Sequence, residues 1–85
     1  MINITEVKVY KTRMDGKIRA FVSITIDDSF VVRDLKVVDG QNGLFVAMPS
    51  RKRSDGDYVD IAHPITSQSR ELIQTKVLEE YKKLT

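Results

Sequence analysis

The sequence has no cysteine, no tryptophan and a single histidine among its 85 residues. Without cysteine there are no disulfides and no thiolate metal sites, and His63 alone cannot build a zinc site without several carboxylates. We therefore expect no metal and no cofactor. A chain this short buries only about 60–65% of the surface that its unfolded form exposes, and small domains often add a disulfide, a metal or a partner subunit. A partner subunit is the remaining option.

Long apolar runs and a strong excess of charge are also missing. No run approaches the roughly 18 apolar residues that cross a bilayer, and residues 1–6 lack the basic start and apolar stretch of a signal peptide. We therefore expect a cytoplasmic protein without a membrane contact. The net charge is only +2, so the distribution of charge must decide whether the partner is nucleic acid.

Alternation of apolar and polar residues predicts strands through most of the first 62 residues. Residues 7–11, 18–26 and 30–38 each show it, with Asp15-Gly16 and Asp27-Asp28-Ser29 as the turns between them. The apolar face of the second strand consists of Ile18, Ala20, Val22, Ile24 and Ile26. The apolar side of the third consists of Val31, Leu35 and Val37.

Residues 44–48 are five consecutive apolar residues, which predicts a strand buried on both faces. Pro49 then ends its ladder or places it at an edge. Residues 50–57 form a hairpin tip with Asp55-Gly56 as the tight turn, and residues 58–62 return as a short strand.

The period then changes to that of a helix. Thr66-Ser67 offers an N-cap hydroxyl, and apolar residues recur at helical spacing on one side of residues 67–84: Leu72, Ile73, Val77, Leu78, Tyr81 and Leu84. The chain is thus predicted to be one α+β domain spanning residues 1–85. It has a small antiparallel β-sheet of about five strands (1–62) and one C-terminal amphipathic α-helix.

One helix covers only one face of a sheet, whereas residues 44–48 need cover on both. A second copy is the simplest source of that cover, and we predict a homodimer. The predicted interface residues are Leu44, Phe45, Val46 and Met48. The alternative is that these residues are only partly buried beneath loops.

The sequence offers few residues that are suited to catalysis. His63 is the only histidine that could activate a nucleophile, and its place at a strand-to-helix junction is more typical of a bond to a backbone carbonyl. Asp27-Asp28 reads as an acidic turn, and the four glycines lie in separate turns without a phosphate-binding motif. We expect neither an enzyme nor a small-molecule substrate.

Basic residues cluster in two places. The first cluster lies around the first predicted turn and comprises Lys8, Lys11, Arg13, Lys17 and Arg19. The second is the basic tip: Arg51, Lys52 and Arg53. Such clusters bind phosphates through counterion release, but basic residues at hairpin tips also keep an edge soluble. The pattern leaves both interpretations open, and Asp55 and Asp57 weaken the field of the basic tip.

Residues 43–50, the basic tip, Asp55-Gly56 and residues 60–65 together closely resemble the SpoVG family (stage V sporulation protein G). The resemblance extends to residues 4–7, 20–25 and 34–38, and so covers nearly the whole chain.

The resemblance implies a dimeric sheet-and-helix protein that binds DNA and RNA as a regulator, linked to sporulation, septum formation and gene control. It implies that the basic tip and the C-terminal helix carry the binding, which places Arg51, Lys52, Arg53 and Arg70 in the contact. Lys11, Arg13 and Lys17 are added as further candidates from their clustering. The alternative function is a protein–protein adaptor that influences cell division without binding nucleic acid.

Overall fold

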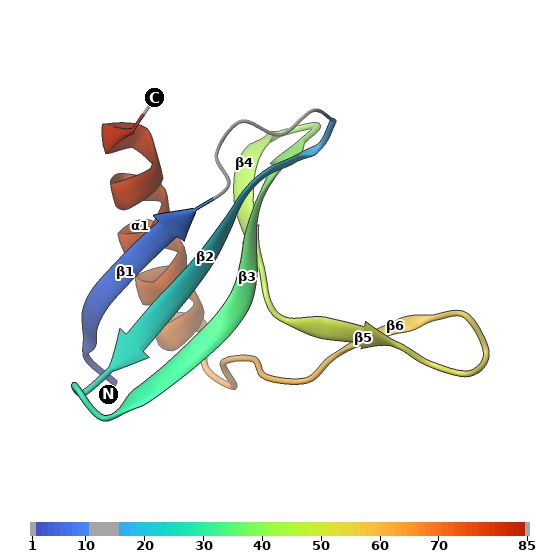
Figure 1. The fold of residues 1–85 in the computed structure, drawn as a ribbon, viewed down its shortest axis with the longest axis horizontal. Helices are drawn as coiled ribbons and strands as arrows, with labels where there is room; N and C mark the ends of the chain where they lie inside the picture. Colours follow the sequence, from blue (N-terminus) through green and yellow to red (C-terminus); the bar gives the residue numbers. More distant parts are fainter. Residues whose placement is uncertain (1, 11–15, 85) are drawn as a thin grey trace.

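Alternating apolar residues form a four-stranded antiparallel sheet in the computed structural model, which describes residues 2–10 and 16–84. The strands lie side by side in chain order (Figure 1): β1 (Ile4–Tyr10), β2 (Ile18–Ile26), β3 (Phe30–Gly40) and β4 (Gly43–Ala47). The strand predicted for residues 18–26 is confirmed at both ends. β1 begins three residues before its predicted start, and β3 continues two residues beyond its predicted end.

The turn between β2 and β3 uses two adjacent aspartates. Asp27 and Asp28 have φ of 52° and 53°, and Ser29 N–H donates to the carbonyl of Ile26 at 3.0 Å. Both central residues of such a tight hairpin turn need positive φ, which aspartate tolerates better than most residues. Asp28 N–H also donates to Thr5 Oγ1 at 3.0 Å. The prediction of an acidic turn is confirmed.

A bulge in β3 changes which valine at the start of this strand faces the core. Val22 pairs with Leu35, but the next inward residue of β2, Ile24, pairs with Val32, so β3 holds one extra residue there. Asp34 in this bulge has φ of 66°. Leu35 and Val37 are buried as predicted, whereas Val31 lies on the other face and is 53% exposed.

The helix α1 (Ser67–Lys83) packs across one face of the sheet and contacts all four strands (Figure 1). Thr66 is its N-cap, as predicted, and Thr66 Oγ1 accepts from Ser69 N–H at 3.1 Å. Ile73, Val77 and Tyr81 are buried. Leu84, predicted on the same apolar side, is instead the exposed C-cap. Within the described ranges no helix has both the length and the apolar character needed to cross a membrane.

The core lies between α1 and the inward face of the sheet, and its buried residues outside α1 are Ala20, Val22, Ile24, Leu35, Val37, Val46 and Met48. β4 contributes Val46 and, just after its end, Met48. Phe45 points to the opposite side and is 42% exposed. Within one chain, α1 covers only one face of residues 44–48, and burial of the other face by a second copy stays a prediction.

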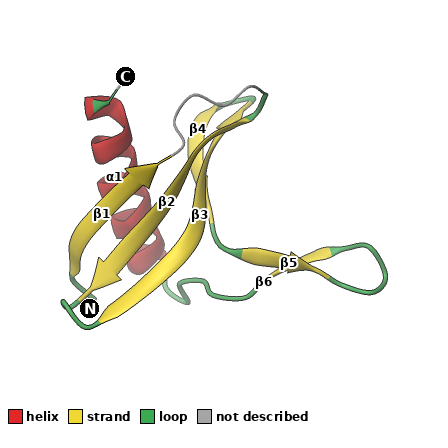
Figure 2. Ribbon diagram, viewed as in Figure 1, coloured by secondary structure: helices red, strands yellow, loops and turns green. Residues whose placement is uncertain are grey.

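Two short strands form a separate two-stranded sheet: β5 (Ser50–Lys52) and β6 (Tyr58–Asp60). We call residues 50–60 the ribbon, and it extends away from the sheet and helix (Figure 2). The predicted α+β class is confirmed, but the sheet of about five strands is four strands plus this pair. Pro49 has no N–H to continue the β4 ladder, and the chain leaves the main sheet there.

Candidate functional site

The ribbon is held by backbone hydrogen bonds at its base and at its tip. At the base, Ile61 N–H donates to the carbonyl of Pro49 at 2.8 Å. At the tip, Arg53 N–H donates to the carbonyl of Asp57 at 2.6 Å, and Gly56 N–H donates to that of Arg53 at 3.0 Å. No contact joins β5 or β6 to the other described strands or to α1. The ribbon therefore presents both of its faces to solvent.

The tip turn depends on Asp55 and Gly56. Gly56 has φ of 94°, a conformation that glycine adopts without a steric cost. Asp55 Oδ1 accepts from Asp57 N–H at 3.0 Å, and Asp55 Oδ2 lies 3.9 Å from Arg53 Nε. Both side chains of this ion pair are more than half exposed, so the pair adds little to the stability of the turn. The carboxylate of Asp55 also offsets part of the positive charge of Arg53.

Strand alternation divides the basic tip between the two faces of the ribbon. Arg51 pairs with Val59, and Lys52 pairs with Tyr58. Because successive side chains of a strand point to opposite faces, Arg51 and Lys52 project in opposite directions. Three aspartates in residues 50–60 balance the three basic residues, so the formal charge of the ribbon is zero. A ligand therefore meets the charges of the basic tip on two sides of a thin projection.

The other basic candidates lie elsewhere. Arg70 is exposed near the start of α1. Lys17 is exposed just before β2, and its carbonyl accepts from Asp39 N–H at 2.7 Å. Lys11 and Arg13 lie outside the described residues. The structure thus brings the three residues of the basic tip together on the ribbon and leaves Arg70 and Lys17 on other elements.

The four residues predicted for a dimer interface divide in the same way. Val46 and Met48 are buried in the core of their own chain, and Leu44 packs against that core. Among them, only Phe45 is exposed, at 42%, and it lies on an edge strand of the sheet. Of the four, Phe45 is the residue available to a second copy.

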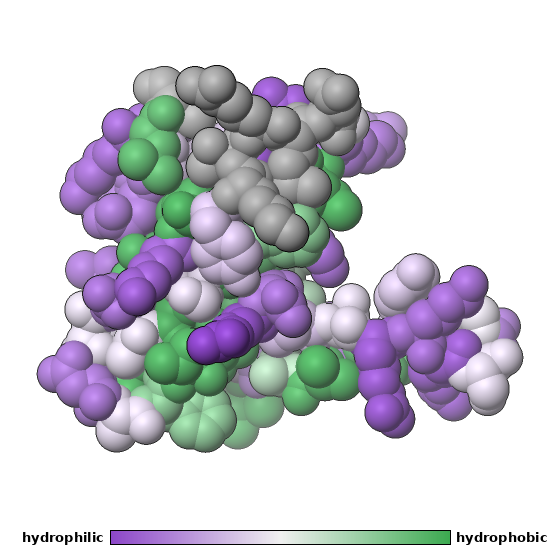
Figure 3. Space-filling model, in the orientation of Figure 1, coloured by the Kyte–Doolittle hydropathy of each residue, from purple (hydrophilic) through white to green (hydrophobic). Residues whose placement is uncertain are grey.

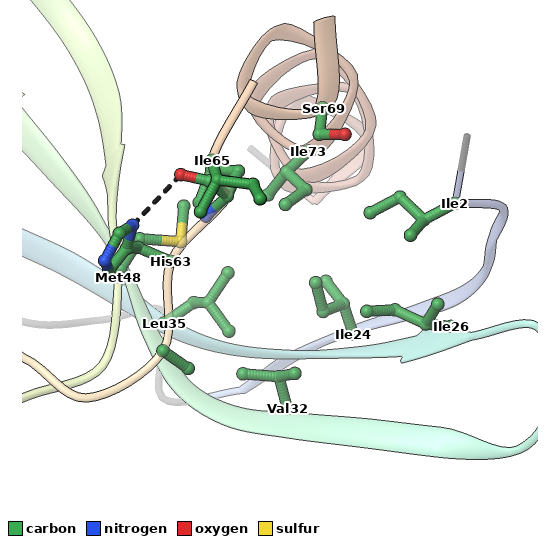
Figure 4. A pocket seen from close by; sticks show the side chains of 12 residues that line it. Ile2, Ile24, Ile26, Val32, Leu35, Met48, His63, Ile65, Ser69 and Ile73 are labelled. Carbon is green, nitrogen blue, oxygen red and sulfur yellow. Dashed lines mark hydrogen bonds between the residues drawn. The ribbon is translucent and has the colours of Figure 1, made fainter. Parts of the chain in front are cut away.

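His63 lies at the mouth of a mostly apolar cavity of about 260 Å³ between the sheet and the start of α1 (Figure 4). Its Nδ1 lies 3.0 Å from the carbonyl oxygen of Pro64, which agrees with the predicted bond to a backbone carbonyl. The lining includes Ile2, Ile24 and Ile73. The described residues contain no cluster of histidine and acidic side chains suited to a metal ion.

We call the face of the sheet opposite α1 the outer face. The sequence predicts that a second copy covers this face at residues 44–48, but it does not predict that two aromatic rings stack there. Hydrophilic and hydrophobic side chains lie side by side over the strands there (Figure 3). Tyr10 and Phe21 stack across β1 and β2, with ring centroids 6.4 Å apart and planes 18° apart. The sequence contained a sign of this pair, because both aromatic residues occupy positions that alternate with the apolar, inward-facing ones in residues 6–10 and 19–25.

Comparison with known proteins shows which family this chain is similar to. Residues 2–83 match the model of the SpoVG family. A protein of Lachnospira eligens is 62% identical over 82 residues, covering 96% of this chain and 93% of the relative. Relatives from Agathobacter rectalis and Clostridium perfringens are 58% and 55% identical, and each covers more than nine-tenths of both chains. All three carry the name "Putative septation protein SpoVG".

Proposed function

This chain belongs to the SpoVG family, and we propose that it is a regulatory protein that binds DNA or RNA through its ribbon and acts in septum formation. The observation that carries the proposal is the exposed basic tip on a projection that contacts neither the main sheet nor α1. Phosphate groups are the complementary ligand for clustered arginine and lysine side chains. The septation role follows the name of the relatives.

The shape of the ribbon supports this assignment better than its net charge does. A thin two-stranded projection can enter a groove of a duplex, and Arg51 and Lys52 then face opposite walls. The three aspartates of the ribbon keep its overall field small. We therefore expect contacts with individual phosphates rather than long-range attraction to dominate the binding.

We propose that the protein acts as a homodimer. The exposed ring of Phe45 on edge strand β4 is the surface that a second copy would cover. Two copies present two ribbons to one polymer, which raises the overall affinity without any new kind of contact. Arg70 near the start of α1 is a secondary contact in this proposal.

The test is equilibrium binding to duplex DNA and to RNA between about 50 and 200 mM salt. Replacement of Arg51, Lys52 and Arg53 by alanine should weaken binding. It should also flatten the plot of log affinity against log salt by about 0.9 for each duplex phosphate that the variant no longer neutralises. The matched control replaces Lys76, Lys82 and Lys83 of α1 by alanine, which changes the net charge equally and should leave the slope near that of the original chain. No binding to either polymer at low salt contradicts the proposal.

A second candidate function, a protein–protein adaptor in septation, is favoured by exposed apolar side chains on and after the ribbon. Tyr58, Ile61 and Ile65 are all largely exposed, and Ile65 reaches 90%. The two functions separate in cells that depend on this protein for septation. Loss of septation with Ile61→Ser and Ile65→Ser, but not with the alanine variant of the basic tip, supports the adaptor.

A further inference from the structure

We propose that the outer face of the sheet binds a single strand of nucleic acid, with Tyr10 and Phe21 as the platform on which its bases stack. This inference rests on the proposed function, because it names a second surface and a strand type for the same class of ligand. The starting observation is a row of residues in register across three strands. Tyr10 pairs with Phe21, and Phe21 pairs with Lys36.

The row places aromatic rings beside a cation. Side chains of directly paired residues lie on the same face, about 5 Å apart, so the Lys36 ammonium group is within reach of a phosphate whose base lies on the two rings. Tyr10 is 38% exposed although its ring stacks on that of Phe21. An aromatic ring open to solvent on a sheet is a surface on which an unpaired base can stack.

A shallow groove continues this platform along β1 to β3. Its lining includes Lys8, Tyr10, Ser23 and Arg33. Lys8 pairs with Ser23 in the row next to Tyr10 and Phe21, and Arg33 lies in β3 at the bulge. A strand stacked on Tyr10 therefore has hydroxyl and cationic side chains along its path. These are the groups that hold phosphates and sugars.

Charge on the part of the outer face formed by β1 to β3 favours nucleic acid over a second copy of this chain at that place. The basic residues on or beside the outer face outnumber the acidic ones: Lys8, Arg19, Arg33 and Lys36 against Glu6 and Asp34. A two-fold contact places the same patch on both partners, which would bring these like charges together. Phosphates instead neutralise them. Phe45 is also on the outer face, but it lies on edge strand β4, two strands away from Phe21 on β2, so a second copy at that edge can cover Phe45 without lying over Tyr10 and Phe21.

Stacking also selects the form of the ligand. The bases of a duplex are already stacked on one another, whereas those of a single strand are free to lie on protein rings. We therefore expect the outer face to prefer a single strand, while the ribbon accounts for binding to a duplex. The two surfaces can be separated by variants of each.

The experiment measures binding by fluorescence anisotropy. The probes are a labelled DNA strand of about twelve thymidines (dT12) and the duplex of that strand with a complementary strand of adenosines (dA12). Tyr10→Leu keeps apolar bulk but removes the ring, and its affinity for dT12 should fall about fivefold or more. Tyr10→Phe keeps the ring and should bind as the original chain does. Lys36→Gln should reduce the salt slope for dT12 by about 0.7, while the control Lys76→Gln on α1 should not. Circular dichroism checks that each variant is folded.

The outcomes distinguish this inference from the proposed function. Equal dT12 affinity of Tyr10→Leu and the original chain, or binding of the duplex alone, overturns the role of the outer face and leaves the ribbon proposal standing. If Tyr10→Leu does not fold, an unchanged salt slope for Lys36→Gln has the same consequence. If the original chain binds neither probe at low salt, the role of the outer face is overturned, and the proposed function is wrong as well if the chain does not bind RNA either.

Discussion

The ring of Phe45 lies over the backbone of Gly40. A Cβ atom placed on Gly40 would lie 2.9 Å from Cε1 of Phe45 and 3.2 Å from its Cδ1. Gly40 pairs with Gly43 where β3 and β4 meet, and an aromatic ring beside a strand glycine covers backbone that glycine leaves open. Phe45 is thus positioned by its own chain on the outer side of β4, while Val46 packs inward.

This arrangement separates the residue proposed for the dimer contact from the residues of the core. Met48→Lys places a charge in the core, where Met48 is 7% exposed, and should unfold the chain because an unpaired buried charge is costly. Phe45→Lys leaves the core intact and should yield a folded monomer of 9.7 kDa. Sedimentation and circular dichroism measure the two effects.

For the dimer, two results count against the prediction. If the original chain sediments at 9.7 kDa at micromolar concentration, no dimer exists under these conditions. If the original chain is dimeric and Phe45→Lys remains dimeric, the interface lies elsewhere.

The bulge in β3 predicts unequal effects for two valines that the simple alternation places on the same side. Val37 is fully buried and Val31 is 53% exposed. Val37→Ala should lower the free energy of unfolding by about 2 kcal/mol, because it reduces apolar burial and leaves a cavity. Val31→Ala should change it by less than about 0.5 kcal/mol. Urea denaturation measures the free energy of unfolding of both variants. Similar losses of stability would show that β3 has no bulge between Val31 and Val37.

Asp34 predicts a backbone effect at the same bulge. Its φ of 66° is unfavourable for β-branched residues and is tolerated by asparagine. Asp34→Val should therefore lower the free energy of unfolding by about 1–2 kcal/mol, whereas Asp34→Asn should stay close to the original value. Thermal or urea denaturation measures both. If valine is tolerated as well as asparagine, residue 34 does not have this conformation.

The N-cap of α1 gives a fourth prediction. Thr66→Ala removes the oxygen that accepts from Ser69 N–H and should lower the free energy of unfolding by about 1 kcal/mol. Thr66→Ser keeps an acceptor and should retain most of that stability. Ser67→Ala, at the adjacent hydroxyl inside the helix, is the matched control and should have little effect. Equal destabilisation by Thr66→Ala and Ser67→Ala in urea denaturation would contradict the assignment of the cap.

Local signals in the sequence predicted the elements well. The alternation of residues 18–26 located β2, and the hydroxyl of Thr66 before a helical period located the start of α1. Proline and aspartate marked the ends and turns, because their effects on φ and on backbone hydrogen bonds act within a few residues. Leu84 was misplaced because periodicity alone does not show where a helix leaves the surface it packs on.

The candidate site was predicted less completely. The basic tip stands out in the sequence, but only the register of β5 with β6 shows that Arg51 and Lys52 face opposite ways. Tyr10 and Phe21 are 11 positions apart in the sequence and stack only because β1 pairs with β2.

The sequence by itself determined that this protein is a small α+β chain with a strand-rich first part, a C-terminal helix and an exposed basic tip. Those properties depend on composition and short-range periodicity. The tertiary structure decided that residues 50–60 leave the main sheet, that Val32 rather than Val31 packs against the core and that Phe45 is exposed in the single chain. Each of these depends on strand pairing and on which face α1 covers, and both are set by contacts between residues far apart in the chain.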